Sequence, residues 1–209
     1  MWNCDGELEE SIQIDMGTYQ TAVFSYDSQL LGFCNMKAVQ VFEIDSQETI
    51  MSTEKSSQFC LAFSKDNRLI ASGVMTGSIY VYKVQGGEIV CELNYGRYNT
   101  IWALDFSYDG QYLISGQDQL VKLWDMNLQK AIREFVAHSK GICDVRFSVD
   151  GWIASSSYDG SVKIWEDQRL LHSVKHKGGF SRKLEFIESG IVTGNNDNSI
   201  ICWDLDFDD

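Results

Sequence analysis

The amino-acid sequence predicts an all-β protein built from five repeats of four short strands. Two sets of aromatic residues recur along the chain with one period of ~40 residues. The first set ends apolar runs and precedes a turn, and it contains Phe24, Phe63, Phe106, Phe147 and Phe186. The second set lies downstream and contains Phe42, Tyr82, Trp124, Trp165 and Trp203. Within each repeat, short alternating segments are separated by Gly, Asp and Asn, without a competing helical periodicity. Four strands in each ~40-residue unit are typical of a β-propeller blade.

The repeats divide residues 1–209 into a single β-propeller domain with five blades. Their expected bounds are about 15–54, 55–94, 95–136, 137–175 and 176–206, the last completed by 7–14. The fourth blade is the clearest, and its expected strands are Ile142–Phe147, Ile153–Ser156, Val162–Trp165 and Leu170–Val174. Tight turns at Asp150-Gly151 and Tyr158-Asp159-Gly160 separate the first three of these strands.

The last blade supplies only three strands from its own repeat. These are expected at Leu184–Phe186, Ile191–Gly194 and Ser199–Trp203, and one unassigned strand remains near the start, at about Leu8–Ile14. Because a long unpaired edge is unfavourable, we expect Leu8–Ile14 to pair with the last blade and close a five-bladed ring. The alternative is an open, incomplete propeller that a partner chain or a second copy completes. Trp2 favours that alternative, since it lies in register with the second aromatic set.

Three dipeptides, Trp124-Asp125, Trp165-Glu166 and Trp203-Asp204, end the expected third strands. Together with the stretch from Ser155 to Trp165, they make the chain resemble the WD-repeat family of β-propellers. The resemblance implies a hydrogen-bonded network inside each blade, formed by a histidine, a serine or threonine, an aspartate and the tryptophan. The matching residues are His138, Ser155, Asp159 and Trp165 in the fourth blade, Thr193, Asp197 and Trp203 in the fifth, and Asp118 and Trp124 in the third.

Composition limits the partners. The 209 residues contain 17 basic and 30 acidic side chains, giving a net charge of −13. This charge disfavours nucleic acid and anionic membranes as partners. Six scattered cysteines indicate reduced thiols in an intracellular protein, with the cytoplasm expected and the nucleus as the alternative. Neither cysteines nor histidines show metal-site spacing, so we expect no metal and no cofactor.

The resemblance also implies that partners bind at the top face, where the first strand of each blade begins. The candidate contact residues are Gln20, Phe59, Met75, Trp102, Tyr158 and Arg182. Large aromatic side chains and arginine are enriched in interface hot spots, and Arg182 is a candidate for a carboxylate on the partner. The acidic ends, Asp5–Glu10 and Asp204–Asp209, could instead attract a basic partner segment.

The sequence therefore predicts a non-enzymatic scaffold that binds proteins or peptides on its top face within a larger assembly. It is expected to be a monomeric ring, or else a subunit of a complex. The first alternative is the incomplete propeller. The second is a small-ligand-binding or hydrolytic propeller, which the candidate channel positions disfavour because they include no carboxylate or histidine. The His138–Ser155–Asp159 set is expected to be structural, with no catalytic residues.

Overall fold

The computed structural model describes residues 19–54, 57–96, 99–177 and 179–204, with Tyr19 and Gln20 described by their backbone alone. The described residues form nineteen strands in five antiparallel sheets. The first sheet contains β1 (Tyr19–Phe24), β2 (Leu30–Asn35), β3 (Val39–Glu43) and β4 (Glu48–Ser52). The second contains β5 (Gln58–Phe63), β6 (Leu69–Val74), β7 (Ser78–Lys83) and β8 (Ile89–Asn94). The third contains β9 (Ala103–Phe106), β10 (Tyr112–Gln117), β11 (Leu120–Asp125) and β12 (Lys130–Val136).

The remaining two sheets complete the series. The fourth contains β13 (Ile142–Phe147), β14 (Ile153–Ser157), β15 (Ser161–Glu166) and β16 (Arg169–Lys175). The fifth contains β17 (Ser181–Ile187), β18 (Gly190–Asn195) and β19 (Ile200–Asp204). Within each sheet, strands consecutive in the chain are paired, so every sheet is a meander. The predicted all-β propeller with five blades is confirmed, and the sheets are called blades 1 to 5 below.

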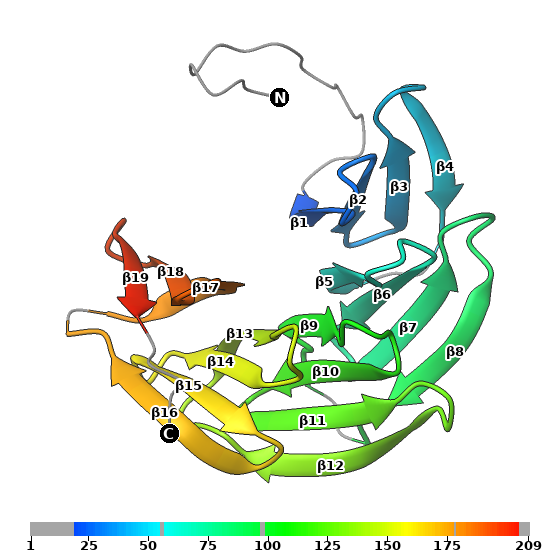
Figure 1. Ribbon diagram of the computed structural model, residues 1–209. Helices are drawn as coiled ribbons and strands as arrows, with labels where there is room; N and C mark the ends of the chain where they lie inside the picture. The colour runs from blue at the N-terminus through cyan, green and yellow to red at the C-terminus, as the bar shows by residue number, and fades with distance from the viewer. Residues whose placement is uncertain (1–18, 55–56, 97–98, 178, 205–209) are drawn as a thin grey trace, which may run out of the picture.

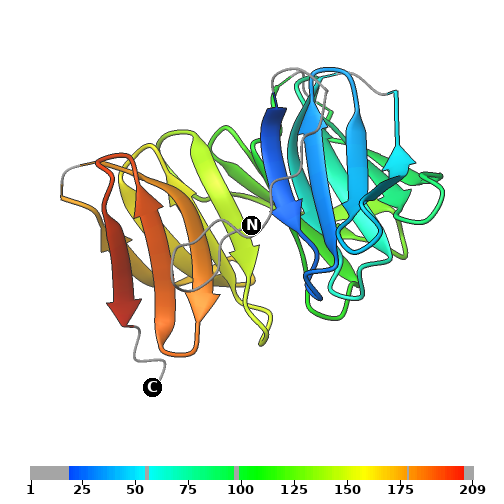
Figure 2. The ribbon, with the colours of Figure 1, turned by 90° about the horizontal axis from the view of Figure 1, so that it is seen from above.

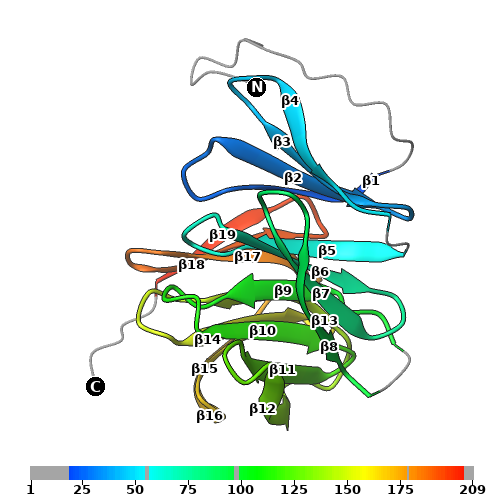
Figure 3. The same ribbon diagram turned by 90° about the vertical axis from the view of Figure 1, so that its right-hand side faces the viewer.

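The blades are arranged in an arc around a common centre (Figure 1). Their first strands line the inside and contact one another in the order β1, β5, β9, β13 and β17. Successive sheets lie face to face, as the side view shows (Figure 3). Within the described residues no strand pairing joins blade 5 to blade 1. The expected closing strand Leu8–Ile14 lies outside the described residues, as does Trp2.

Apolar side chains fill the space between neighbouring blades. Between blades 2 and 3, for example, Ile79 and Val81 lie in one buried cluster with Phe106 and Trp124. Similar clusters lie between the other neighbouring pairs, and the cluster between blades 4 and 5 contains the fewest buried residues. Each large side chain that becomes fully buried contributes about 1.5–3 kcal/mol. In blades 2 to 4 the predicted aromatic repeat therefore marks the packing between blades, whereas Phe24 of blade 1 is 55% exposed.

A serine and an aspartate hold the turn between the first two strands in blades 1 to 3. The Ser25 hydroxyl donates to Asp27 Oδ1 at 2.6 Å and accepts from the Leu30 amide at 2.9 Å. Blades 2 and 3 repeat both bonds, starting from Ser64 and Ser107. Because the serine and the aspartate hold the turn, the residue between them need not be proline. The chain contains no proline at all.

The meander places the loops at two faces, between which the strands run (Figure 2). The top face carries the connections between second and third strands and those between blades. The bottom face carries the connections between first and second strands and between third and fourth strands. Of the cysteines in the described ranges, Cys34, Cys60 and Cys91 are free and buried, Cys143 is free and half-buried, and Cys202 is free and exposed.

In the described part of the chain, no helix is long and apolar enough to cross a membrane.

Candidate functional site: the top face

A β-bulge recurs at the start of the innermost strand. In blades 1, 2, 4 and 5 the pairing of the first two strands shifts at Gln20, Phe59, Cys143 and Arg182. Trp102 holds the equivalent place in blade 3, immediately before β9, and its amide donates to the Gly116 carbonyl at 3.0 Å. A bulge leaves one residue out of the ladder and turns its side chain away from the sheet. The same position therefore places one residue per blade at the top end of the innermost strand, at a bulge in four of the five blades.

Four of the candidate contact residues are exposed. The exposed fraction is 41% for Trp102, 41% for Met75 and 44% for Tyr158, and Arg182 is also exposed. Phe59 is half-buried and lies edge-on to Trp102, with ring centroids 5.3 Å apart. The structure thus brings Phe59 and Trp102 together across blades 2 and 3. The side chain of Gln20 lies outside the described residues.

Tyr158 and Arg182 meet around a third residue, Phe180, between blades 4 and 5. The Tyr158 and Phe180 rings have centroids 4.6 Å apart, and the Arg182 guanidinium carbon lies 5.5 Å from the Phe180 centroid. The backbone of Phe180 is fixed by Asn196, whose Oδ1 accepts from the Phe180 amide at 2.7 Å and whose amide donates to the Phe180 carbonyl at 3.1 Å. This preorganised group is called the Phe180 cluster below.

Sequence reasoning missed two residues of this face, Phe180 and Met36. Phe180 lies in a connection between blades, where the repeat pattern specifies no residue type. Met36, which is 43% exposed, follows β2 as Met75 follows β6 and Tyr158 follows β14. Aligning the repeats by the residue that follows the second strand would have found it.

The residues implied by the resemblance form a buried network in blade 4. The Ser155 hydroxyl lies 2.8 Å from His138 Nε2 and accepts from the Trp165 indole N–H at 2.9 Å. His138 Nδ1 lies 3.2 Å from Asp159 Oδ2. Burial lowers the pKa of His138, which favours the neutral ring. Burial also opposes ionisation of Asp159, but hydrogen bonds from Ser161 and from the Ser139 amide outweigh it and hold the pKa of Asp159 well below its usual range.

This arrangement has the connectivity of a catalytic triad, but the serine is inaccessible. Ser155 is fully buried and lies within β14, so no substrate carbonyl can reach its hydroxyl. A nucleophilic serine instead requires an exposed turn. The chemistry available to these three residues is mutual hydrogen bonding, which ties β14 to the connection that precedes β13.

In blades 3 and 5 the tryptophan indole also donates to a side-chain hydroxyl, but the residues that supply the hydroxyl and pair with the aspartate differ from those of blade 4. The Trp203 indole donates to Thr193 Oγ1 at 3.1 Å, and His176 Nε2 lies 3.1 Å from Asp197 Oδ2. In blade 3 the Trp124 indole donates to Ser115 Oγ at 2.8 Å, while the side-chain amide of Asn99 donates to the Asp118 carboxylate. Ser115 and Asn99 are further residues that sequence reasoning missed.

The inner wall of the arc carries charged residues that bridge blades. Asp144 Oδ2 accepts from the Leu184 amide at 3.2 Å, and its other oxygen lies 2.9 Å from Arg146 Nη1. Asp105 Oδ2 accepts from the Phe147 amide at 2.7 Å. Burial raises the pKa of Asp105 to about 6, against the opposing influence of Arg146. Each carboxylate therefore joins the innermost strand of its own blade to that of the next blade.

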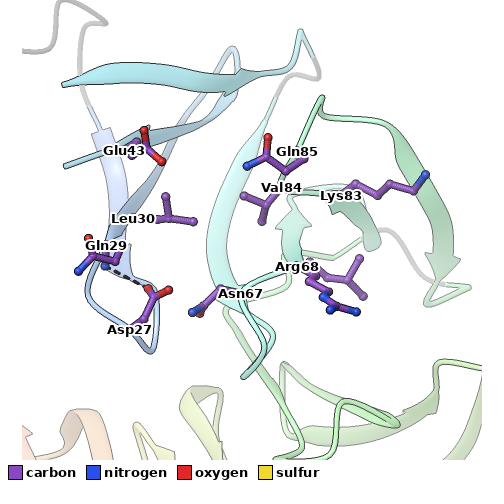
Figure 4. A pocket seen from close by; sticks show the side chains of 10 residues that line it. Asp27, Gln29, Leu30, Glu43, Asn67, Arg68, Lys83, Val84 and Gln85 are labelled. Atoms are coloured by element: carbon purple, nitrogen blue, oxygen red, sulfur yellow. Dashed lines mark hydrogen bonds between the residues drawn. The ribbon is translucent and has the colours of Figure 1, made fainter. Parts of the chain in front are cut away.

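A pocket of 770 Å³ lies on the bottom face between blades 1 and 2 (Figure 4). Leu30 and Val84 line it together with charged side chains, among them Asp27, Glu43 and Arg68. Asp27 Oδ1 is occupied by the Gln29 amide at 3.0 Å. No serine, cysteine or histidine lines the pocket, and its ionisable side chains are Asp27, Glu43, Arg68 and Lys83. Among the described residues no group of His, Cys, Asp and Glu could hold a metal ion.

Solved structures share this architecture. The chain superimposes on the structure titled "Crystal structure of RRP9 WD40 repeats" with a TM-score of 0.83 and 17% sequence identity. The match covers 93% of this chain and 62% of that one. At this identity the likeness shows the fold alone.

Two relatives carry the repeat in longer proteins. WD repeat-containing protein 1 of Gallus gallus is 26% identical over 160 residues, covering 70% of this chain and 26% of the relative. The U3 small nucleolar RNA-associated protein 15 homolog of Xenopus laevis is 23% identical over 167 residues, covering 77% of this chain and 32% of the relative. The chain thus spans about a quarter to a third of the relatives' length.

The family model described as "WD domain, G-beta repeat" matches residues 47–83, 89–125 and 129–166, which is more than half of the chain. Each match runs from the fourth strand of one blade to the third strand of the next, or close to it, so the sequence repeat is offset from the blade. The protein therefore belongs to the WD40 repeat family.

Proposed function

We propose that this protein is a non-enzymatic interaction scaffold whose top face binds protein or peptide partners within a larger assembly. The observation that carries the proposal is the recurring bulge at the start of the innermost strands, which presents Phe59, Trp102 and Arg182 at one face. Tyr158 adds a further exposed ring there. Rigidly held aromatic and arginine side chains dominate binding energy in protein interfaces.

The relatives support a place in an assembly. WD40 propellers generally act as scaffolds, and one relative is named as associated with U3 small nucleolar RNA. We propose protein contacts as the direct ones for this chain, since its net charge of −13 opposes binding to phosphates. A cytoplasmic location is proposed, and the nucleus is the alternative that this relative favours.

Affinity capture with paired variants tests the proposal. The double variant Trp102→Ala/Arg182→Glu removes two side chains of the top face. The matched control Tyr108→Ala/Arg68→Glu removes an exposed aromatic ring and an arginine from the bottom face. Proteins that co-elute with the wild type and with the control, but not with the top-face variant, would support the proposal. Equal capture by both variants, with unchanged melting temperatures, would contradict it.

A second candidate is an incomplete propeller subunit that a partner chain completes. Blade 4 buries Val162 and Ile164 against blade 5, and the equivalent positions in blade 5 are Ile200 and Cys202. Ile200 is 77% exposed and Cys202 is also exposed. An exposed face with the composition of an inter-blade face favours a further blade as its partner.

Light scattering after size exclusion tests this second candidate. The purified chain should then form a complex, either with a co-expressed partner or with a second copy, and Ile200→Lys should abolish it. A wild-type chain that remains monomeric at tens of micromolar concentration, and captures no partner that depends on Ile200, would rule the candidate out.

A further inference from the structure

The two loop-bearing faces differ in charge. The exposed carboxylates of the bottom loops are Asp27, Asp45, Asp66, Glu88, Asp109, Asp150, Asp167 and Glu188, against two basic residues, Lys65 and Arg68. The described basic residues of the top-face loops and of the β17 bulge are Lys37, Lys140, Lys177 and Arg182, all exposed, against four carboxylates, Glu54, Asp118, Asp159 and Asp197. The bottom loops are thus strongly acidic, whereas on the top face the four cations balance the four carboxylates.

Three of the four carboxylates of the top-face loops, Asp118, Asp159 and Asp197, are engaged by neighbouring side chains. Asp159 contacts His138 and Ser161, Asp197 contacts Ser199 and His176, and Asp118 accepts from Asn99. Among the described residues the four exposed cations form no ion pair with a carboxylate. The cations of this face are therefore available to a partner.

One of these cations, Arg182, belongs to the Phe180 cluster, and two more, Lys140 and Lys177, lie in the connections next to it. Arg182 lies over the Phe180 ring, and Lys177 belongs to the same connection between blades 4 and 5. Lys140 lies beside Gly141, whose carbonyl accepts from the Tyr158 amide at 2.9 Å, and its own carbonyl accepts from Ser157 at 3.1 Å. The two rings are thus in contact with Arg182, and Lys140 lies in a loop whose backbone is bonded to Ser157 and Tyr158.

We infer that the Phe180 cluster, with Lys140 and Lys177, binds an acidic peptide segment of a partner protein, with a carboxylate placed on Arg182. The inference rests on the proposed function and names the chemistry of the partner. The guanidinium gives charge-assisted, bidentate hydrogen bonds to a carboxylate, and an apolar side chain of the peptide packs on Tyr158 and Phe180. The acidic bottom face repels the same segment, which fixes the face used.

An acidic peptide fits these observations better than RNA does. Affinity for RNA depends on many phosphate contacts along a basic track, whereas here few cations surround two rings in a strongly acidic protein. A peptide carboxylate next to an apolar side chain requires only one arginine and a ring surface, which Arg182, Tyr158 and Phe180 supply.

Selection from a displayed library of short random peptides, with the full chain as bait, tests the inference. We expect the selected peptides to carry Asp or Glu next to an aromatic or aliphatic residue. The best one is then compared with its twin in which Asp and Glu are replaced by Asn and Gln. Binding is measured by fluorescence polarisation against wild type, Arg182→Gln and Arg68→Gln. Single-stranded oligouridine is the RNA probe.

The amide twin and Arg182→Gln should each weaken binding by about tenfold or more, and the two losses should not add, because they remove the same contact. Arg68→Gln should change affinity less than twofold. Amide twins that bind as well as acidic peptides, or oligouridine that binds more tightly than peptide through Arg182, would overturn the inference. Non-acidic peptides that depend on Trp102 would overturn it and leave the proposed function standing, whereas failure to select any peptide would count against both.

Discussion

Blades 3 and 4 hold equivalent tryptophans in different ways. In blade 4 the Ser155 hydroxyl serves both Trp165 and His138, whereas in blade 3 Ser115 serves Trp124 and an Asn99–Asp118 pair lies apart from it. The hairpin between the second and third strands has two residues in blade 3 and three in blade 4. The indole-to-hydroxyl bond is thus the constant element, and the histidine is replaceable when the hairpin is shorter.

The same two blades treat their inner carboxylates differently. Asp144 of blade 4 forms ion pairs with Arg146 and Lys183 at 2.9 and 3.3 Å. Asp105 of blade 3 accepts a backbone bond from Phe147 but forms no ion pair within the described residues. One buried carboxylate is therefore compensated by cations, and the other depends largely on a single amide. The difference predicts opposite responses to substitution.

The largest effect is expected from Asp144→Ala, at about 4 kcal/mol of unfolding free energy. The change removes the acceptor of the Leu184 amide and deprives Arg146 of its buried partner. Urea unfolding measures the loss. Glu185→Gln is the control, because its ion pair with Arg146 is 60% exposed on the Glu185 side and should matter by less than about 1 kcal/mol. Equal losses for Asp144→Ala and Glu185→Gln would contradict the expectation that the buried ion pair matters more than the exposed one.

The shared hydroxyl should make blade 4 more sensitive than blade 3. Ser155→Ala leaves both His138 and the Trp165 indole without a buried partner, so we expect a loss of about 3 kcal/mol. Ser115→Ala leaves the Trp124 indole alone, and the expected loss is about 1.5 kcal/mol. Thermal and urea unfolding of the two variants measure the difference. Losses of the same size would mean that the histidine bond adds nothing.

Asp105→Asn should stabilise the protein by about 3 kcal/mol at pH 7.5. Burial raises the pKa of Asp105 to about 6 from its ordinary 3.8, so the folded state binds the proton more tightly. Its favourable contribution is complete below pH 3.8 and is lost as the pH rises through 6. Asparagine is always neutral and can still accept from the Phe147 amide. The gain should shrink towards pH 4 in urea unfolding, and a gain independent of pH would refute this reasoning.

The smallest effect concerns His138, which burial keeps neutral by lowering its pKa. The unfolded chain takes up a proton below its ordinary value of 6.5, so this contribution to stability is present above pH 6.5 and is lost as the pH falls. The slope is at most about 1.4 kcal/mol per pH unit. His138→Asn, which imitates blade 3, should lack this dependence. The stability difference between wild type and variant at pH 7.5 and pH 5.5 is the measurement, and a constant difference would exclude the mechanism.

The repeat pattern predicted the fold because the same residues end strands and pack between blades. Phe106 and Trp124 are both nearly fully buried in one cluster, as their places in the two aromatic sets indicate. The pattern could not predict partners that come from another blade. The bond from Phe147 to Asp105 joins residues 42 positions apart, and although Phe147 belongs to the first aromatic set, nothing local marks Asp105 as the acceptor for its amide. The repeat pattern did not predict Phe180 for a related reason, since its position is fixed by a hydrogen bond to Asn196 rather than by a strand.

The arc has consequences for how the molecule opens. Blade 5 packs on blade 4 through the smallest of the apolar clusters, which on the blade 4 side contains Ala154 of β14 and Val162 and Ile164 of β15. Blades 2, 3 and 4, by contrast, each have a neighbour on both sides. In chains of repeats that touch only their neighbours, local unfolding begins at the repeat whose unfolding breaks the fewest interfaces. Amide hydrogen exchange should therefore be fastest in β18 and β19 and slowest in β9 and β10. The Phe180 cluster spans blades 4 and 5, so a bound peptide would slow this exchange at the end of the arc.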